Sequence, residues 1–258
     1  MSKYLYLMKI NFSLVASQRG ELVFSFLRRI ALVVMMITLW SFTLEEGETN
    51  KYIAYFSIFY FVFDVLMTGR AGSRFVRDVL TGKINTFLLK PIYYPLYRIM
   101  DVLTLIFARS IIPMTLFVIA AILFPAEFGP GSFTSFVIFL PTIIMAVFLY
   151  QFIMMTLASL SLWFANIGFL FTVYGLVISF VNGGLIPISE YPENIQKILF
   201  FLPTSYGGGI QVDMYLGRYS VSESLTAFFV VSAWTLFFAF VSNRVYMRGL
   251  SKLEAVGG

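Results

Sequence analysis

The sequence has 258 residues, of which 59% are hydrophobic, 19% are aromatic and 12% are charged, and its net charge is +5. Soluble domains carry about 25% charged residues, so this composition excludes an ordinary soluble protein and indicates a membrane protein. Cys and His are both absent, which excludes disulfide frameworks, thiolate nucleophiles, Ser-His proteases and His-ligated metalloenzymes.

Residues 1–20 predict an amphipathic helix that lies in the headgroup region. At helical spacing Lys9, Ser13 and Ser17 form a narrow polar stripe, and apolar side chains fall on the other side. Polar residues interrupt the segment throughout, unlike the unbroken apolar core of a signal peptide. We interpret it as a cytoplasmic anchor for the first span; the alternative is a role in relaying motion from a cytoplasmic partner.

Six later stretches are apolar and long enough to cross a bilayer, which takes about 20 residues of helix. They cover residues 24–44, 52–68, 102–124, 133–157, 167–188 and 225–245. Backbone groups in hydrocarbon must be hydrogen-bonded within their own segment, so each stretch predicts a helix. We therefore expect an all-α polytopic membrane protein with six transmembrane helices, in which residues 1–258 form one transmembrane domain.

The positions of Lys and Arg predict the topology. Most of them lie in residues 3–29, 70–98 and 244–252, whereas most Asp and Glu lie in the loops of the other side. Cytoplasmic loops carry the excess of Lys and Arg, so both termini and the segment 69–101 should be cytoplasmic. Because the basic residues sit beside spans and form no compact basic domain, no nucleic-acid partner is expected.

The second span carries an aromatic face formed by Tyr52, Tyr55, Phe59 and Phe63. Aromatic faces suit flat or cationic amphiphiles, so this face is a candidate lining for a substrate path. Ordinary packing in the core or against lipid is the alternative.

A short amphipathic helix is predicted in the cytoplasmic segment, over residues 73–81. Ser73 can cap its start and Gly82 can close its end. The remaining side chains divide into an apolar face of Phe75, Val76, Val79 and Leu80 and a polar face of Arg74, Arg77 and Asp78. Such a helix can lie on the membrane or press into a groove on a soluble partner. In the second case Phe75 and Leu80 are the expected groove contacts, and Arg77 and Asp78 the expected rim charges.

Two charged residues fall inside expected spans, Asp64 in the second and Arg109 in the third. At about 1.5 Å per residue, both lie about 9–12 Å from the cytoplasmic end of their spans. Intramembrane charges usually face protein or water, so we expect a structural ion pair between them. A proton or substrate site is the alternative.

The fifth span carries a stripe of small, weakly polar residues at intervals of three or four: Gly168, Thr172, Gly175, Ser179 and Asn182. Small residues let helices approach closely in lipid. The stripe therefore predicts packing within the subunit or, as the alternative, a dimer face or the lining of a substrate path.

The external segment 189–224 is predicted to dip into the outer leaflet. Residues 195–201 are apolar but far too short to cross, and Pro192 and Pro203 bound them. They suit an interfacial or re-entrant helix, with an ordered loop as the alternative. Residues 206–209 contain three consecutive glycines and predict a flexible turn.

Two stretches carry a family resemblance. In residues 78–92 the run Leu88-Leu89-Lys90-Pro91 follows Gly82 before the third span. Residues 182–192 read Asn-Gly-Gly-Leu-Ile-Pro-Ile-Ser-Glu-Tyr-Pro, and Leu202-Pro203 and Leu216-Gly217 come later. In order and spacing, these motifs and the six spans resemble permease subunits of the type-2 ABC exporter family, closest to the compact prokaryotic branch with a separate ATPase.

The resemblance implies a working unit of two permeases, identical or paralogous, on two ABC ATPase subunits. It implies that residues 73–81 are the coupling helix that sits in a cleft of the ATPase. Residues 187–202 would form short outer-leaflet helices, and the permeases would meet near their second and fifth spans. ATP and Mg²⁺ would bind to the ATPase, because the only Gly-Lys here, Gly82-Lys83, is followed by Ile84 and forms no phosphate-binding loop.

The expected function is therefore the permease subunit of an ATP-driven exporter in a prokaryotic cytoplasmic membrane. It would move an amphipathic or hydrophobic molecule outward and carry no catalytic residue, cofactor or metal of its own. A self-sufficient secondary transporter or channel is the alternative, because six spans with intramembrane charges and aromatic faces also allow it. An intramembrane enzyme is disfavoured, since most acidic residues lie in loops.

Overall fold

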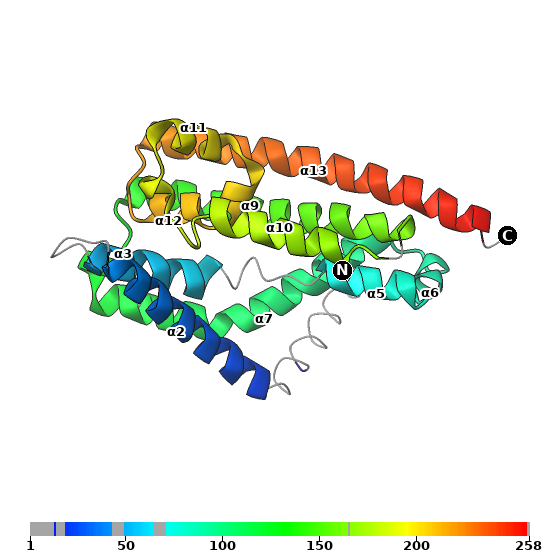
Figure 1. The fold of residues 1–258 in the computed structure, drawn as a ribbon, viewed down its shortest axis with the longest axis horizontal. Helices are drawn as coiled ribbons and strands as arrows, with labels where there is room; N and C mark the ends of the chain where they lie inside the picture. The colour runs from blue at the N-terminus through cyan, green and yellow to red at the C-terminus, as the bar shows by residue number, and fades with distance from the viewer. Residues whose placement is uncertain (1–12, 14–18, 43–48, 64–70, 165, 257–258) are drawn as a thin grey trace.

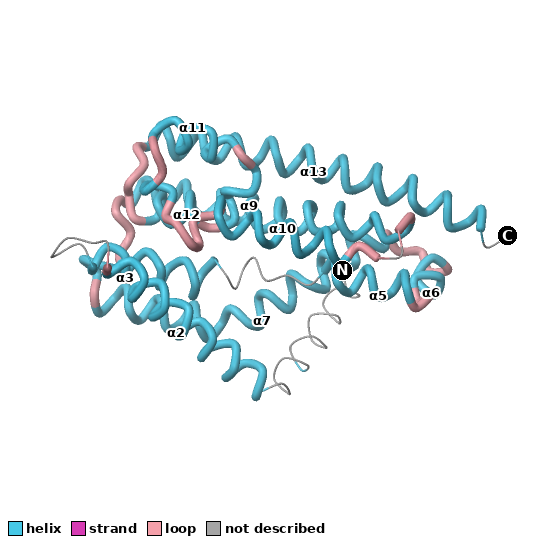
Figure 2. The backbone as a smooth tube through the Cα atoms, viewed as in Figure 1, coloured by secondary structure: helices cyan, strands magenta, loops and turns pink. Residues whose placement is uncertain are grey.

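The protein is represented by a computed structural model that describes residue 13 and residues 19–42, 49–63, 71–164 and 166–256. Throughout these ranges the regular elements are helices, and no strand occurs in them (Figure 2). The expected all-α fold is confirmed. Residues 1–12 and 14–18 of the predicted interfacial helix lie outside the described residues.

Four helices within the described ranges are long and apolar enough to cross a membrane. They are α2 (Arg19–Ser41), α7 (Tyr94–Leu123), α9 (Phe133–Ser159) and α13 (Val221–Val256). They correspond to the first, third, fourth and sixth expected spans. Helix α7 begins eight residues earlier than expected, with Pro95 in its first turn, where the missing N–H is no loss. Residues 94–101, assigned from sequence to the cytoplasmic segment, are therefore part of this helix.

The second and fifth expected spans differ from the prediction. Helix α3 (Thr49–Ile58) continues as a π-helix, η1 (Phe59–Phe63), and the rest of that stretch lies outside the described residues. Helix α10 (Gly168–Val181) has 14 residues, which at about 1.5 Å each make about 21 Å, short of the roughly 30 Å of hydrocarbon. The expected end at residue 188 was wrong, and the count of six spans stays a prediction.

The end of α10 has a local physical cause. The Asn182 side-chain oxygen accepts a hydrogen bond from the Gly184 N–H at 3.0 Å, which replaces the next helical hydrogen bond. Gly183 then adopts φ +83°, a left-handed conformation that glycine takes without strain. The chain therefore turns out of the helix at residues 182–184 and does not continue to Pro187.

Short helices gather at the two ends of the long ones (Figure 1). At the end where α13 finishes lie α5 (Ala71–Leu80), α6 (Ile84–Leu88) and the turn η2 (Leu160–Leu162). At the opposite end lie α8 (Pro125–Phe128), η3 (Ile188–Glu190), α11 (Glu193–Phe201), η4 (Pro203–Gly207) and α12 (Gly209–Tyr215). The predicted cytoplasmic segment and the predicted external segment are thus at opposite ends of the molecule.

Buried apolar side chains form two main clusters among the described residues. The larger one joins α3, α9, α12 and α13, and the smaller one joins α5, α7, α9 and α13. Helices α9 and α13 pack along one another and contribute to both clusters. These two helices therefore hold the short helices of each end in place.

Candidate functional site

Helix α5 is the short amphipathic helix that the sequence predicts, shifted by one or two residues to Ala71–Leu80. Gly82 follows it at φ +69°, and its N–H donates to the Val79 carbonyl at 3.1 Å, which ends the helix as expected. Among the described side chains of α5, those of Ser73, Arg77 and Leu80 are exposed, spaced four and three residues apart. They form one face of the helix, and we call this face the α5 outer face.

Phe75 does not lie on the α5 outer face. Its side chain is 0% exposed and packs at 5.4 Å from the Tyr94 ring and 6.1 Å from the Tyr246 ring, measured between centroids. Leu80, assigned to the same apolar face, is 56% exposed. The expectation that both residues contact a partner groove was therefore wrong for Phe75. The large ring is taken up by the chain's own core, because α7 and α13 meet α5 at this point.

Asp78 belongs to a buried network of charges that joins α5 to α7. Its carboxylate accepts hydrogen bonds from the Tyr94 hydroxyl and from Nη2 of Arg98. Arg98 also donates from Nη1 to Asp101 Oδ2 at 3.2 Å, and the same oxygen accepts from Nη1 of Arg74 at 2.6 Å. Two arginines thus alternate with two carboxylates. Asp78 was expected to be an exposed rim charge, which is wrong, since it is buried among these partners.

Aromatic rings surround the guanidinium group of Arg98. Its Cζ lies 5.3 Å from the centroid of Phe87 and 5.4 Å from those of Tyr94 and Tyr97. Cation–π contacts of this kind stabilise a desolvated arginine. Together with the two carboxylates they fix the position of α5 and α6 relative to the start of α7.

At the opposite end, aromatic donors hold the turn that follows α10. Trp40 Nε1 donates to the Leu185 carbonyl at 3.2 Å, Tyr55 to that of Gly183 at 3.0 Å and Tyr60 to that of Gly184 at 2.9 Å. Three consecutive carbonyls outside regular helix are therefore satisfied by side chains from α2, α3 and η1. Unpaired carbonyls in an apolar setting are costly, so these aromatic residues stabilise the turn.

The aromatic face of the second expected span is largely internal. Tyr55 and Phe59 are buried in the larger cluster, and Phe59 lies against the backbone of Gly184 and Gly208. The expected role of Tyr55 and Phe59 in a substrate path is therefore corrected. Within this chain both residues pack in the core, which was the alternative interpretation of this face. The Phe63 side chain lies outside the described residues.

The residues expected to form a flexible turn, 206–209, are buried and ordered by contacts. Tyr206 and all of α12 are buried. The Gly209 N–H donates to the Asn182 carbonyl at 2.6 Å, so the backbone of α12 lies directly against the turn after α10. The glycines permit this close approach, and the flexible turn was a wrong interpretation of them.

Asp213 on α12 is buried and accepts a hydrogen bond at 2.8 Å from Nη1 of Arg218, a half-exposed residue beyond the helix. Burial raises the pKa of the Asp213 carboxyl to about 6, because desolvation outweighs the attraction of Arg218. The Arg218 guanidinium lies 5.5 Å from the Tyr55 ring centroid and borders an open cavity of about 310 Å³ with Lys51 and Glu190. No sequence pattern indicates that this acid is buried.

The small-residue stripe of α10 is open. Gly168, Thr172 and Gly175 are exposed, Ser179 and Asn182 are partly exposed, and α10 has no buried residue. A Cβ placed on Gly175 would meet nothing within 4 Å. Apart from Asn182, which holds the turn after α10, the stripe is not covered by the described part of this subunit, and its role as a dimer face or path lining stays a prediction.

Arg109 on α7 donates from Nη2 to Glu21 on α2 at 2.8 Å, and both side chains are partly exposed. Asp64, its expected partner, lies outside the described residues, so that pair stays a prediction. The contact with Glu21 joins the two long helices α2 and α7.

A family model described as an ABC-2 family transporter protein matches residues 21–257, nearly the whole chain and all of the elements described above except the first two residues of α2. The chain belongs to the ABC-2 transporter family. No curated protein matches the sequence.

As an ABC-2 family member, the chain is a multi-pass membrane component of an ABC transporter, a system whose partners include ATPase subunits. The family is a transport family and not a catalytic one. The resemblance found in residues 78–92 and 182–192 is thereby confirmed.

In this ABC-2 chain the candidate coupling helix α5 is predictable from the sequence, but the buried network of charges that joins α5 to α7 was not predicted. Arg98 was counted only as a cytoplasmic basic residue, and Asp101 was given no role. Their spacing of three residues on a helix, at the start of an apolar run, is the signal that could have indicated a paired internal site. Asp78 could not be assigned to them, since its distance along the chain gives no register.

Proposed function

We propose that this chain is the permease subunit of an ATP-driven exporter, which moves an amphipathic or hydrophobic molecule outward across a prokaryotic cytoplasmic membrane. Two permeases and two ATPase subunits form the working unit, and ATP and Mg²⁺ bind to the ATPases. Family membership supports the transporter assignment. The outward direction rests on the resemblance of residues 78–92 and 182–192 to type-2 exporters.

The observation that carries the proposal is the combination of an exposed α5 outer face with a buried ionic connection to α7. Arg77 and Leu80 are available to a partner, and Leu89, just beyond α6, is 89% exposed at the same end of the molecule. Exposed apolar side chains grouped with a charge at the end of the molecule, away from the long apolar helices, favour a docking surface. Arg98 connects α5 to the long apolar helix α7, so a displacement of α5 by the ATPase would also move α7.

The second permease is proposed to pack on α10. Phe169, Leu176 and Phe180 are exposed on this helix, and the open space at Gly175 allows another helix to approach closely. A substrate path between two such copies would be lined by the small-residue stripe. The partner permease is a second copy of this chain or a paralogue.

The test is capture of the ATPase followed by an efflux assay. Arg77→Glu and Leu80→Asp change exposed side chains, so each variant should be inserted and folded but should retain less ABC ATPase in a pull-down and export less. Lys197→Glu reverses an exposed charge at the opposite end and serves as the control. Gradient-driven transport by this chain alone in proteoliposomes would refute the proposal and favour a secondary transporter.

A further inference from the structure

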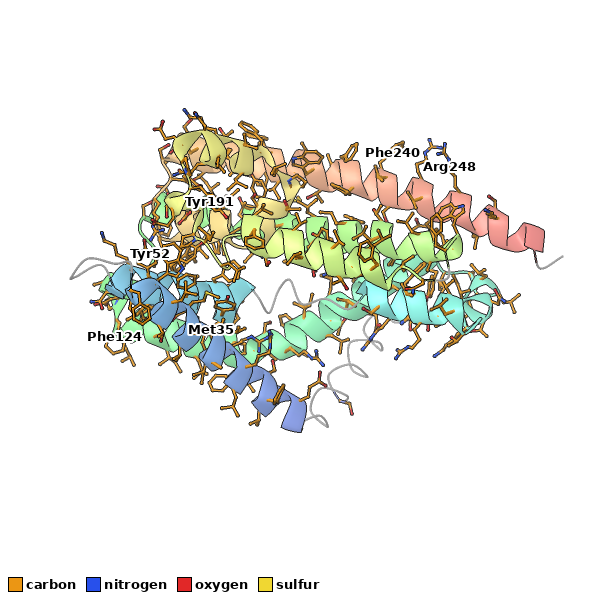
Figure 3. The ribbon with its side chains drawn as sticks, viewed as in Figure 1. Met35, Tyr52, Phe124, Tyr191, Phe240 and Arg248 are labelled. Carbon is orange, nitrogen blue, oxygen red and sulfur yellow. The ribbon has the colours of Figure 1, made fainter. Side chains whose placement is uncertain are left out.

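A groove of about 790 Å³ lies between residues 160–164 and residues 240–248 of α13. Its walls are Leu160, Trp163 and Phe164 on one side, and Phe240, Val241, Arg244, Val245 and Arg248 on the other. Figure 3 shows Phe240 and Arg248 along the outer side of α13, away from the face of that helix that covers the core. The groove lies at the same end of the molecule as α5 but is not part of the α5 outer face.

The charge in the groove is entirely positive. Arg244 and Arg248 lie one helical turn apart, about 6 Å along the axis, and no acidic residue contributes to the walls. Neither arginine forms an ion pair with the described residues; Arg244 instead lies 5.0 Å from the centroid of the Phe240 ring. Two neighbouring arginines beside a span, with no carboxylate in the groove, attract an anionic headgroup electrostatically.

The rest of the groove is apolar. Phe164 and Phe240 are both exposed, and Phe240, Arg244 and Arg248 form one stripe that changes from aromatic to cationic along the helix. Beside the groove the two walls meet at Gly249: a Cβ there would lie 2.7 Å from Leu162 Cβ and 3.0 Å from the Trp163 ring, so η2 packs directly on α13. Trp163 also lines the groove, and tryptophan is enriched at membrane interfaces.

We propose that this groove binds one anionic glycerophospholipid, with its phosphate between Arg244 and Arg248 and its acyl chains along Phe164 and Phe240. An apolar wall that ends in two cations matches a molecule whose apolar chains end in a phosphate. Basic pockets beside spans on the cytoplasmic side bind anionic headgroups by the same physics. The choice of the cytoplasmic leaflet rests on the proposed topology; the binding itself does not depend on the proposed transport function.

A lipid fits this surface better than the ATPase does. The groove lies on the outer side of α13, and each of its walls carries an exposed phenylalanine ring that a bilayer would cover. An acidic protein surface would match the two arginines but would leave Phe164 and Phe240 uncovered. The α5 outer face and Leu89 already supply a separate docking surface at the end of the molecule.

The experiment measures lipid binding to the purified full-length chain by native mass spectrometry. The protein is delipidated and titrated with dioleoyl phosphatidylglycerol or dioleoyl phosphatidylcholine, which share acyl chains and differ in headgroup charge. The wild type should prefer the anionic lipid, and Arg244→Gln/Arg248→Gln should lower that preference about tenfold. Arg244→Lys/Arg248→Lys should retain most of it. Lys83→Gln/Lys197→Gln removes the same charge elsewhere and should behave as the wild type.

Three results would overturn the proposal. The first is an unchanged preference in the double Gln variant. The second is competition by glycerophosphate or inorganic phosphate as strong as by the lipid, which would make the groove a site for a free anion. The third is a double Gln variant that keeps the lipid and loses the ATPase in the pull-down, which would make the groove a protein contact. Because no ATPase is present in the lipid titration, failure of the exporter proposal leaves its outcome intact.

Discussion

Arg98 on α7 donates to the carboxylate of Asp78 on α5, and the two side chains are only 8% and 3% exposed. Buried ion pairs of this kind do not add much stability in themselves, but removing one partner leaves an uncompensated charge. The pair therefore makes the position of α5 depend on that of α7. A helix that docks an ATPase needs such a connection to act on the spans.

Arg98→Gln should lower the stability of the protein by about 3–5 kcal/mol, because two carboxylates, on Asp78 and Asp101, then lose their common partner. Thermal unfolding of the purified protein in detergent measures the effect. The double variant Asp78→Asn/Arg98→Gln should lose less than the two single variants combined. Lys197→Gln, which removes an exposed charge, is the control, and an Arg98→Gln midpoint equal to that of this control would contradict the role given to Arg98.

Phe75 and Leu80 should behave oppositely when they are truncated. Phe75→Ala removes a fully buried ring and should cost about 3–5 kcal/mol, whereas Leu80→Ala at an exposed position should stay within about 0.5 kcal/mol. The same thermal unfolding assay separates them. Phe75→Asp should reduce the yield of folded protein, and Leu80→Asp should reduce only ATPase capture. Normal stability of Phe75→Asp together with lost capture would restore Phe75 as a contact residue.

Phe75 and Leu80 also show which features of the fold can be predicted from sequence patterns and which cannot. Apolar length predicts the long helices, and the Ser73–Gly82 signals predict α5 to within two residues, because these are local properties. Which face of α5 is covered depends on α7 and α13, which are distant in sequence, and both Phe75 and Leu80 satisfy the apolar pattern. The prediction of a flexible turn at the glycines 207–209 was wrong for a similar reason. Glycine permits either flexibility or a close backbone contact, and the contact with Asn182, which is distant in the sequence, decides between the two.

Asp213 should make stability depend on pH. Its pKa rises from 3.8 to about 6 on folding, so the folded state binds the proton more tightly. The associated stability is therefore fully present below about pH 4 and is lost as the pH rises through about 6, with a magnitude of about 3 kcal/mol. Asp213→Asn keeps an acceptor for Arg218 but cannot titrate. As the pH is raised from 4 to 7, the unfolding midpoint of the wild type should decrease relative to that of Asp213→Asn. A difference between the two midpoints that does not change with pH would exclude a raised pKa.

Gly183 and Gly175 provide a matched pair of glycine substitutions. Gly183→Ala places a Cβ 2.6 Å from Gly209 Cα at a φ of +83°, so it should destabilise the monomer by more than about 1 kcal/mol. Gly175→Leu fills open space on α10 and should leave the unfolding midpoint almost unchanged. It should instead reduce the fraction of paired permeases in crosslinking or size-exclusion experiments. A Gly175→Leu protein that pairs normally would show that α10 is not the dimer face.

The topology can be tested by labelling, because the chain contains no Cys and each introduced thiol is unique. Lys197 on α11 and Lys83 beside α6 are exposed and lie at opposite ends of the molecule. In intact cells a membrane-impermeant maleimide should label Lys197→Cys, and Lys83→Cys should react only after permeabilisation. Ser251→Cys, near the end of α13, should behave as Lys83→Cys does, since α13 finishes at the same end as α6. The Cys-free parent protein controls for background. Labelling of Lys83→Cys and Lys197→Cys from the same side would contradict the proposed spans. Labelling of Lys83→Cys in intact cells, with Lys197→Cys reacting only after permeabilisation, would show that the orientation is the reverse of the proposed one.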